Sequence, residues 1–260
     1  MATNNYTLGR GKVYFSRFKT GTRIPAGFMY MGNTPEFSLT IESETLDHFS
    51  SDEGIREKDD SVPLQVTRTG SLITDNINPA NVALFFFGSE IKVTQLVASS
   101  ATEEFEDIKK GAAYQIGITE SNPTGLQGIN PTGFSVEITG GADLVAGTDF
   151  TMNYDTGMLQ LLDTSTVAVD GVDLTVTFAV RASTRDRIIS GSSPVEGAMK
   201  YVAFNPKGKN FDYMLPYVRV TPNGDYALKG DEWQQIPFTI EALKPTVGEA
   251  IYMDGRPVYS

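Results

Sequence analysis

Residues 35–74 read PEFSLTIESETLDHFSSDEGIREKDDSVPLQVTRTGSLIT. Apolar and polar residues alternate strictly in its first and last parts, residues 35–44 and 61–74, which predicts two half-buried strands. Between these runs lies an acidic connector interrupted by a glycine, Leu46 to Asp60. Tight hairpins join strands with about two to five residues, and longer structureless loops in compact domains are usually functional. The stretch therefore predicts two antiparallel strands joined by a long loop, 45–61, that has a role of its own.

Composition limits the classes of function. The 260 residues include 21 Lys and Arg against 32 Asp and Glu, a formal net charge of −11. Such a chain has no simple attraction for a nucleic-acid backbone. It contains no cysteine, which excludes disulfides, thiolate metal sites and cysteine nucleophiles. The N-terminus lacks the pattern of a signal peptide and no segment reaches 18 apolar residues, so we expect a protein made in the cytoplasm with no membrane segment.

The rest of the chain predicts an all-β fold with one short helix. The helix is expected over 78–88, because Asn78 can cap it, Pro79 suits its first position and Gly88 can end it. Short alternating runs with dense turn formers between them predict a small inserted sandwich-like module over 120–183, including a tight turn at 154–157. Strand-like runs resume after residue 184, with turns at 207–209 and 222–224, and both termini look like arms.

Catalytic and metal-binding chemistry is sparse. His48 is the only histidine, which excludes a zinc site of several imidazoles and leaves a Ser-His-Asp site only within the acidic loop. The acids at 52–53 and 59–60 do not have the spacing of a calcium loop. Carboxylate pairs are numerous enough to leave a glycosidase open. We expect no enzyme activity and no cofactor.

The most concentrated basic patch comprises Arg181, Arg185 and Arg187. It is interpreted either as the solvated exit of a strand or as a docking site for an acidic loop.

A series of short motifs, in this order along the chain, resembles the major tail tube protein of long, non-contractile-tailed bacteriophages, most of all that of Chi-like, flagellum-dependent phages. The motifs are the alternating strand through Phe37 and Ile41, the segments 46–54 and 58–60, the Asn-Pro helix, and the runs 194–197, 204–206, 215–216, 230–231 and 233–236. The resemblance covers residues 1–119 and 184–260, so the module at 120–183 is interpreted as an inserted decoration.

The resemblance implies a β-sandwich or partly open barrel that forms hexameric rings, which stack through the long loop and terminal arms into a tube. It implies a virion protein whose partners are other copies of itself and the tape measure, tail terminator and distal tail proteins. Genomic DNA would pass through the channel without specific binding, on its way into the host cell. The polar faces of the alternating runs supply the expected lumen residues: Glu42, Glu44, Thr67, Thr69, Gln235, Thr239 and Glu241.

For ring stacking, we expect the loop to contact a basic surface on the next subunit. The loop side comprises Asp47, His48, Asp52, Glu53, Arg56, Asp59 and Asp60, and the basic side comprises Arg181, Arg185, Arg187, Lys207 and Lys209. The main alternative is a cell-surface or carbohydrate-binding β-sandwich, suggested by the 120–183 module and the aromatic residues Tyr114, Tyr154 and Trp233.

Overall fold

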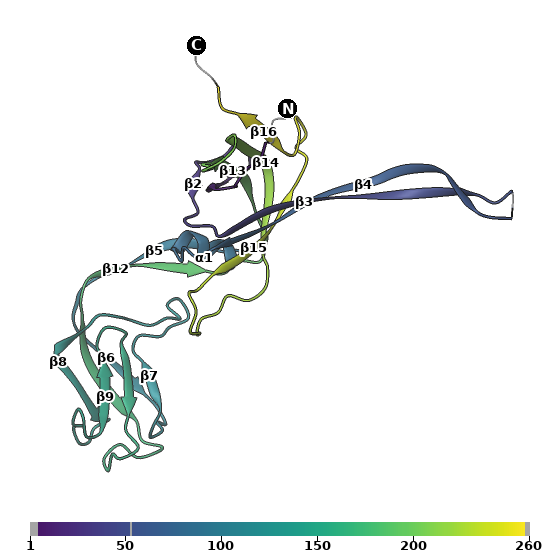
Figure 1. Cartoon of the computed structure of the whole chain (residues 1–260). Coiled ribbons are helices and arrows are strands. Elements are labelled where there is room, and N and C mark those ends of the chain that lie inside the picture. The colour runs from purple at the N-terminus through teal and green to yellow at the C-terminus, as the bar shows by residue number, and fades with distance from the viewer. Residues whose placement is uncertain (1–4, 53, 258–260) are drawn as a thin grey trace. The chain divides into compact units, whose positions relative to one another are not determined.

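The all-β expectation is confirmed. The computed structural model describes residues 5–52 and 54–257, and within them the chain forms sixteen strands and one helix (Figure 1). The strands are grouped in several antiparallel sheets.

The chain divides into two compact units. Unit 1 comprises residues 1–91 and 187–260, and unit 2 comprises residues 92–186. The chain passes from one unit to the other within β5 (Ser89–Gln95) and returns within β12 (Ser183–Ile189), and these two strands pair with each other.

Unit 1 is built on one large sheet with the strand order β2-β1-β13-β14-β15-β4-β3, and β16 also pairs with β14. The strands are β1 (Gly11–Arg17), β2 (Met29–Tyr30), β3 (Glu36–Ser50), β4 (Glu57–Thr74), β13 (Val195–Ala203), β14 (Phe211–Pro222), β15 (Ile236–Ala242) and β16 (Tyr252–Gly255). Much of the expected terminal arms therefore belongs to the sheet, because ladder hydrogen bonds fix β1, β2 and β16 in place.

The core of unit 1 lies on one face of this sheet. Alternate residues of β14 and β15, among them Val220, Phe238 and Ile240, are fully buried there. Helix α1 (Pro79–Phe85) packs Phe85 against Phe238, with ring centroids 6.4 Å apart.

The predicted start of α1 is confirmed. The Asn78 side chain accepts a hydrogen bond from the backbone N–H of Asn81 at 2.8 Å, and Pro79 is the first helical residue. Its predicted end is wrong in detail, because Phe87 takes the left-handed conformation (φ 52°) that was expected of glycine. Gly88 is needed for a different reason: a Cβ there would lie 1.9 Å from the carbonyl oxygen of Ile189.

The long loop expected over 45–61 is wrong. β3 and β4 continue as one antiparallel hairpin through Ser50 and Glu57, with two register shifts, so residues 51–56 are all that separates them. Charged residues have low β-propensity, so the sequence did not suggest strands here. Ion pairs between the two strands, such as Lys58 with Asp47 at 2.7 Å, stabilise the strand pairing. In Figure 1 this hairpin extends far beyond the strands that flank its base.

Unit 2 contains two three-stranded sheets, β7-β10-β9 and β6-β11-β8, around a separate core. Its strands are β6 (Ala98–Phe105), β7 (Ala113–Gln115), β8 (Ile129–Ile138), β9 (Phe150–Asn153), β10 (Met158–Leu161) and β11 (Leu174–Val180). The turn predicted at 154–157 joins β9 and β10, and Gly157 there has φ 76°.

The inserted unit begins earlier than expected, at Lys92 rather than at residue 120. β6 and β7 were assigned to the first domain, but β6 pairs with β11 and β7 pairs with β10, both in unit 2. Pairing between strands far apart in the chain cannot be recognised from the local sequence of a polar segment. The change in composition near residue 120 therefore did not mark the start of unit 2.

Candidate assembly surfaces

The face of the unit 1 sheet opposite the core carries rows of hydroxyl and carboxylate side chains. Residues paired directly across antiparallel strands project from the same face. The register aligns Thr40 with Thr69 and Glu241, and Ser38 with Ser71, Thr239 and Thr221; towards the hairpin, Glu42 lies opposite Thr67 and Glu44 opposite Gln65.

Six of the seven expected lumen residues therefore share one face: Glu42, Glu44, Thr67, Thr69, Thr239 and Glu241. Gln235 lies outside, because β15 begins at Ile236 and Gln235 belongs to the preceding connection. That connection, residues 223–235, is also longer than the tight turn expected at 222–224.

One arginine organises the acidic end of this face. The Arg219 guanidinium donates to Glu196 and to Glu241, each at 3.2 Å, and the Tyr217 hydroxyl donates to Glu196 at 2.9 Å. The hydrogen bond to Glu196 raises the pKa of Arg219. Burial, followed by the bond to Glu196, raises the pKa of Tyr217, so both donors remain protonated at neutral pH. Glu241 was expected on this face from the sequence, but Glu196 and Arg219, which lie on the neighbouring strands β13 and β14, were not.

The β3–β4 hairpin exposes its backbone along both edges. β3 is the last strand of the sheet, and β15 pairs with β4 only over Thr69 to Thr74. Long unpaired strand edges readily accept another chain unless they are protected.

The same hairpin also exposes apolar side chains, although the sequence predicted half-buried strands over 35–44 and 61–74. Ile41 is 63% exposed, and the cross-strand partners Leu46 and Val62 are 62% and 53% exposed. Further exposed apolar residues of the hairpin are Phe49, Ile55, Leu64 and Val66. Leu46, Phe49 and Ile55 within a charged connector were the signal that could have revealed this surface.

The charged residues near the hairpin tip are partly paired among themselves. Asp47 binds Lys58 and the Ser61 hydroxyl, each at 2.7 Å, and His48 lies 2.5 Å from Asp59. The hydrogen bond from Lys58 lowers the pKa of Asp47, and the one from His48 lowers the pKa of Asp59.

The other hairpin residues named for stacking differ in their surroundings. The Arg56 guanidinium lies 5.2 Å from the centre of the Phe49 ring. Asp52 and Asp60 are exposed, and Glu53 lies outside the described residues.

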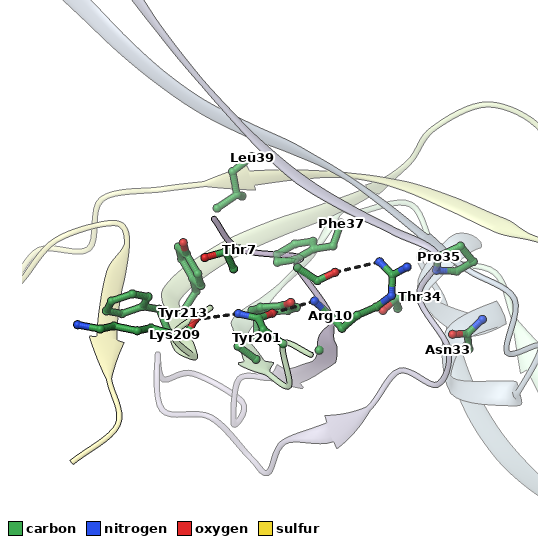
Figure 2. Close-up of a pocket in the computed structure, with 15 residues that line it drawn as sticks. Thr7, Arg10, Asn33, Thr34, Pro35, Phe37, Leu39, Tyr201, Lys209 and Tyr213 are labelled. Atoms are coloured by element: carbon green, nitrogen blue, oxygen red, sulfur yellow. Dashed lines mark hydrogen bonds between the residues drawn. The ribbon is translucent and has the colours of Figure 1, made fainter. Parts of the chain in front are cut away.

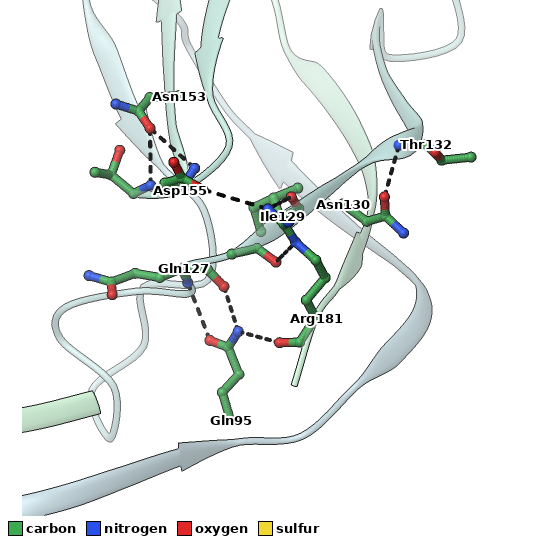
Figure 3. A network of polar contacts seen from close by, with 10 residues as sticks. Gln95, Gln127, Ile129, Asn130, Thr132, Asn153, Asp155 and Arg181 are labelled. Carbon is green, nitrogen blue, oxygen red and sulfur yellow. Dashed lines mark hydrogen bonds and ion pairs between the residues drawn. The ribbon is translucent and has the colours of Figure 1, made fainter. Parts of the chain in front are cut away.

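The five expected basic contact residues are divided between the units. Arg181 and Arg185 belong to unit 2, whereas Arg187, Lys207 and Lys209 belong to unit 1. Figure 3 shows the Arg181 guanidinium directed at the chain around Ile129, where it donates to the backbone carbonyl oxygens of Gly128 and Ile129.

Arg185 also makes a hydrogen bond within its own unit, donating to the carbonyl oxygen of Gly125 at 3.4 Å. In unit 1, Lys207 lies 5.8 Å from the centre of the Tyr6 ring, and Lys209 lines an open pocket. The lysines are therefore better placed than Arg181 and Arg185 to contact another molecule.

Comparison with known families gives one match, over residues 6–250, to a family described as "Protein of unknown function UCP028589". The chain belongs to this family. No curated protein matches it.

Two further observations concern other classes of site. Among residues 5–52 and 54–257, no group of three or more His, Asp or Glu side chains is arranged to hold a metal ion. No helix in the same ranges is long and apolar enough to cross a membrane.

Proposed function

We propose that this protein is the repeating subunit of a bacteriophage tail tube, which polymerises as stacked, hexameric rings around a channel for genomic DNA. The observation that carries the proposal is the β3–β4 hairpin. It presents two unpaired edges and a set of exposed apolar side chains that its own unit leaves uncovered.

Self-association accounts for these features physically. Pairing of the free edges with a neighbouring copy satisfies backbone groups that otherwise invite uncontrolled aggregation. Burial of the hairpin's exposed apolar side chains against another copy removes apolar surface from water, which favours association. A contact between two different surfaces of one chain generates rings or filaments.

The polar face of the sheet suits the wall of a DNA channel. In the rows aligned across β3, β4, β15 and β14, the Ser, Thr and Glu side chains are accompanied by one cation, Arg219, which donates to Glu196 and Glu241. The carboxylates of such a wall repel phosphates within a screening length of about 8 to 10 Å at physiological salt, which disfavours adhesion of DNA to these rows. The lumen assignment of Glu42, Glu44 and Glu241 rests on this argument.

Stacking of one ring on the next is proposed to use the hairpin tip. Because Asp47 and Asp59 already have partners in the hairpin, Asp52 and Asp60 are the acids we assign to a basic surface that includes Lys207 on the next copy. The tape measure, terminator and distal tail proteins remain proposed partners of the completed tube.

Sedimentation velocity over a wide range of protein concentration tests the proposal. We expect concentration-dependent growth to rings and longer assemblies, and arrest of growth in a variant with Asp52→Lys and Asp60→Lys. A chain that stays monomeric at every concentration would contradict the tube, whereas unchanged growth of the variant would contradict only the charge pairing.

One observation favours the carbohydrate-binding alternative: Trp233 is 93% exposed, and exposed aromatic rings can stack on sugars. The other two aromatics named for it do not support it, because Tyr114 and Tyr154 pack against the core of unit 2. Glycan binding that disappears in Trp233→Ala would establish this alternative.

A further inference from the structure

An open pocket in unit 1 has aromatic walls. It has a volume of about 780 Å³ and lies beside the first residues of β3 and the facing parts of β13 and β14. Tyr201 is central to it: its ring centroid is 5.7 Å from that of Phe37 and 6.0 Å from that of Tyr213. Phe211 also lines the pocket. Figure 2 shows the side chains of Phe37, Tyr201 and Tyr213 together with that of Arg10.

The charges that line this pocket are all positive. Among the described residues that line it, Arg10 and Lys209 are the charged side chains, and none is a carboxylate. In a chain with 32 acids and 21 bases, this makes the pocket a local cationic site. It therefore suits an aromatic group accompanied by negative charge.

The connection between β14 and β15 has the complementary properties. Trp233 and Leu228 on it are 93% and 74% exposed. The segment 225–235 carries Asp225, Asp231 and Glu232 against Lys229, and all four are exposed. An indole left in water beside three carboxylates is an unusual surface feature, because tryptophan is normally well buried.

We propose that Trp233 of one copy inserts into the Arg10–Lys209 pocket of a neighbouring copy. The proposal rests on the self-assembly proposed above and names a contact that assembly uses. The pocket and the Trp233 segment share no lining residue. In the rings and tube proposed above, the contact is therefore head-to-tail and repeats from copy to copy.

Size and chemistry both favour this occupant. The volume lies within the range of about 300 to 1,000 Å³ that is usual for pockets that bind organic groups. Aromatic rings attract one another edge-to-face at centroid separations of about 4.5 to 7 Å, and an arginine over an indole adds a cation–π interaction. Apolar side chains of the hairpin, such as Leu46 and Val62, could also enter the pocket of a neighbouring copy. They are aliphatic, so Arg10 and Lys209 would not strengthen their binding as they strengthen that of an indole beside carboxylates.

The chain contains one tryptophan, so tryptophan fluorescence reports on the surroundings of Trp233. We expect the emission of the full chain to shift to shorter wavelength on assembly, and Trp233 to become protected from acrylamide. Trp233→Ala should raise the critical concentration for assembly by about 30-fold or more, as aromatic residues at interface hot spots do. Val247→Ala, at a side chain that is 89% exposed, is the matched control and should leave assembly unchanged.

Two changes on the pocket side identify the partner surface. Gly9 lines the pocket and a Cβ built there meets nothing within 4 Å, so Gly9→Phe should fill the pocket without disturbing the fold and abolish the spectral shift. The pair Arg10→Glu and Lys209→Glu should weaken the shift, and adding Asp231→Lys and Glu232→Lys should restore it. Circular dichroism confirms that each variant is folded.

The outcomes separate this inference from the proposed function. Assemblies in which Trp233 stays open to acrylamide, or in which Gly9→Phe leaves the shift intact, overturn the Trp233 contact and leave the tube standing. A chain that never assembles overturns the tube and this contact together.

Discussion

Replacement of Leu46 and Val62 by threonine should weaken assembly without weakening the subunit. The two side chains are cross-strand partners on the hairpin and are 62% and 53% exposed. Full burial of a Leu or Val side chain contributes about 1.5 to 3 kcal/mol. Since somewhat more than half of each side chain remains to be buried and threonine keeps part of the apolar surface, each change should remove about 1 kcal/mol.

The expected effect on assembly follows from that sum. About 2 kcal/mol for the double variant corresponds to a rise of about 30-fold in the critical concentration, since 1.4 kcal/mol is tenfold. Threonine preserves β-propensity, so the free energy of unfolding of the unassembled chain should change by less than about 0.5 kcal/mol.

Pelleting of assemblies over a concentration series measures the critical concentration, and urea denaturation at low concentration measures subunit stability. Leu96→Thr is the matched control, because Leu96 is 79% exposed and lies in unit 2, away from the hairpin in the chain. An unchanged critical concentration in the double variant would refute the claim that the hairpin's apolar surface is buried on assembly. So would an equal rise in the Leu96→Thr control.

Three further predictions concern the subunit itself. Asn81→Ala should destabilise unit 1 by about 2 kcal/mol, because the buried Asn81 amide donates to the carbonyls of Met31 and Asn76; urea denaturation that shows no loss would contradict this. Asp149→Asn should destabilise unit 2 by about 1 to 3 kcal/mol, because the carboxylate is 3% exposed and accepts hydrogen bonds from Ser165 and the Val145 amide; proteolysis confined to residues 92–186 would reveal it. The lowered pKa of Asp59 means that its stabilising bond to His48 is present above the unfolded value of about 3.9 and is lost as pH falls through the lower folded value. Protection of the amides at the hairpin tip, corrected for the intrinsic pH dependence of exchange, should therefore fall as pH is lowered below about 4, and Asp59→Asn should show low protection at every pH.

Short-range rules predicted much of the fold. Alternation in 35–44 and 61–74 identified two strands, the Asn78-Pro79 pair identified the start of the helix, and the turn at 154–157 was placed correctly. These features depend on neighbouring residues, so the sequence displays them directly.

The failures have a common physical cause. The charged connector forms strand because Asp47 and His48 meet Lys58 and Asp59 across the hairpin, and such partners are visible only once the register is known. β6 was hidden for the same reason, since its partner β11 lies about 70 residues away.

For the candidate surfaces too, local sequence features were predictable and features that depend on tertiary structure were not. Period alone placed Glu42, Glu44 and Glu241 on one polar face, and the register agrees. It could not show that Leu46 and Val62 lack a covering layer, or that Arg10 and Lys209 meet at one pocket, since both depend on tertiary structure.

The central claim is that the chain polymerises into a hollow tube, and negative-stain electron microscopy of the purified full-length protein tests it most directly. The account predicts hexameric rings and stacked tubes with a stain-filled channel at concentrations above the critical value. Globular particles without a channel at every concentration would contradict it.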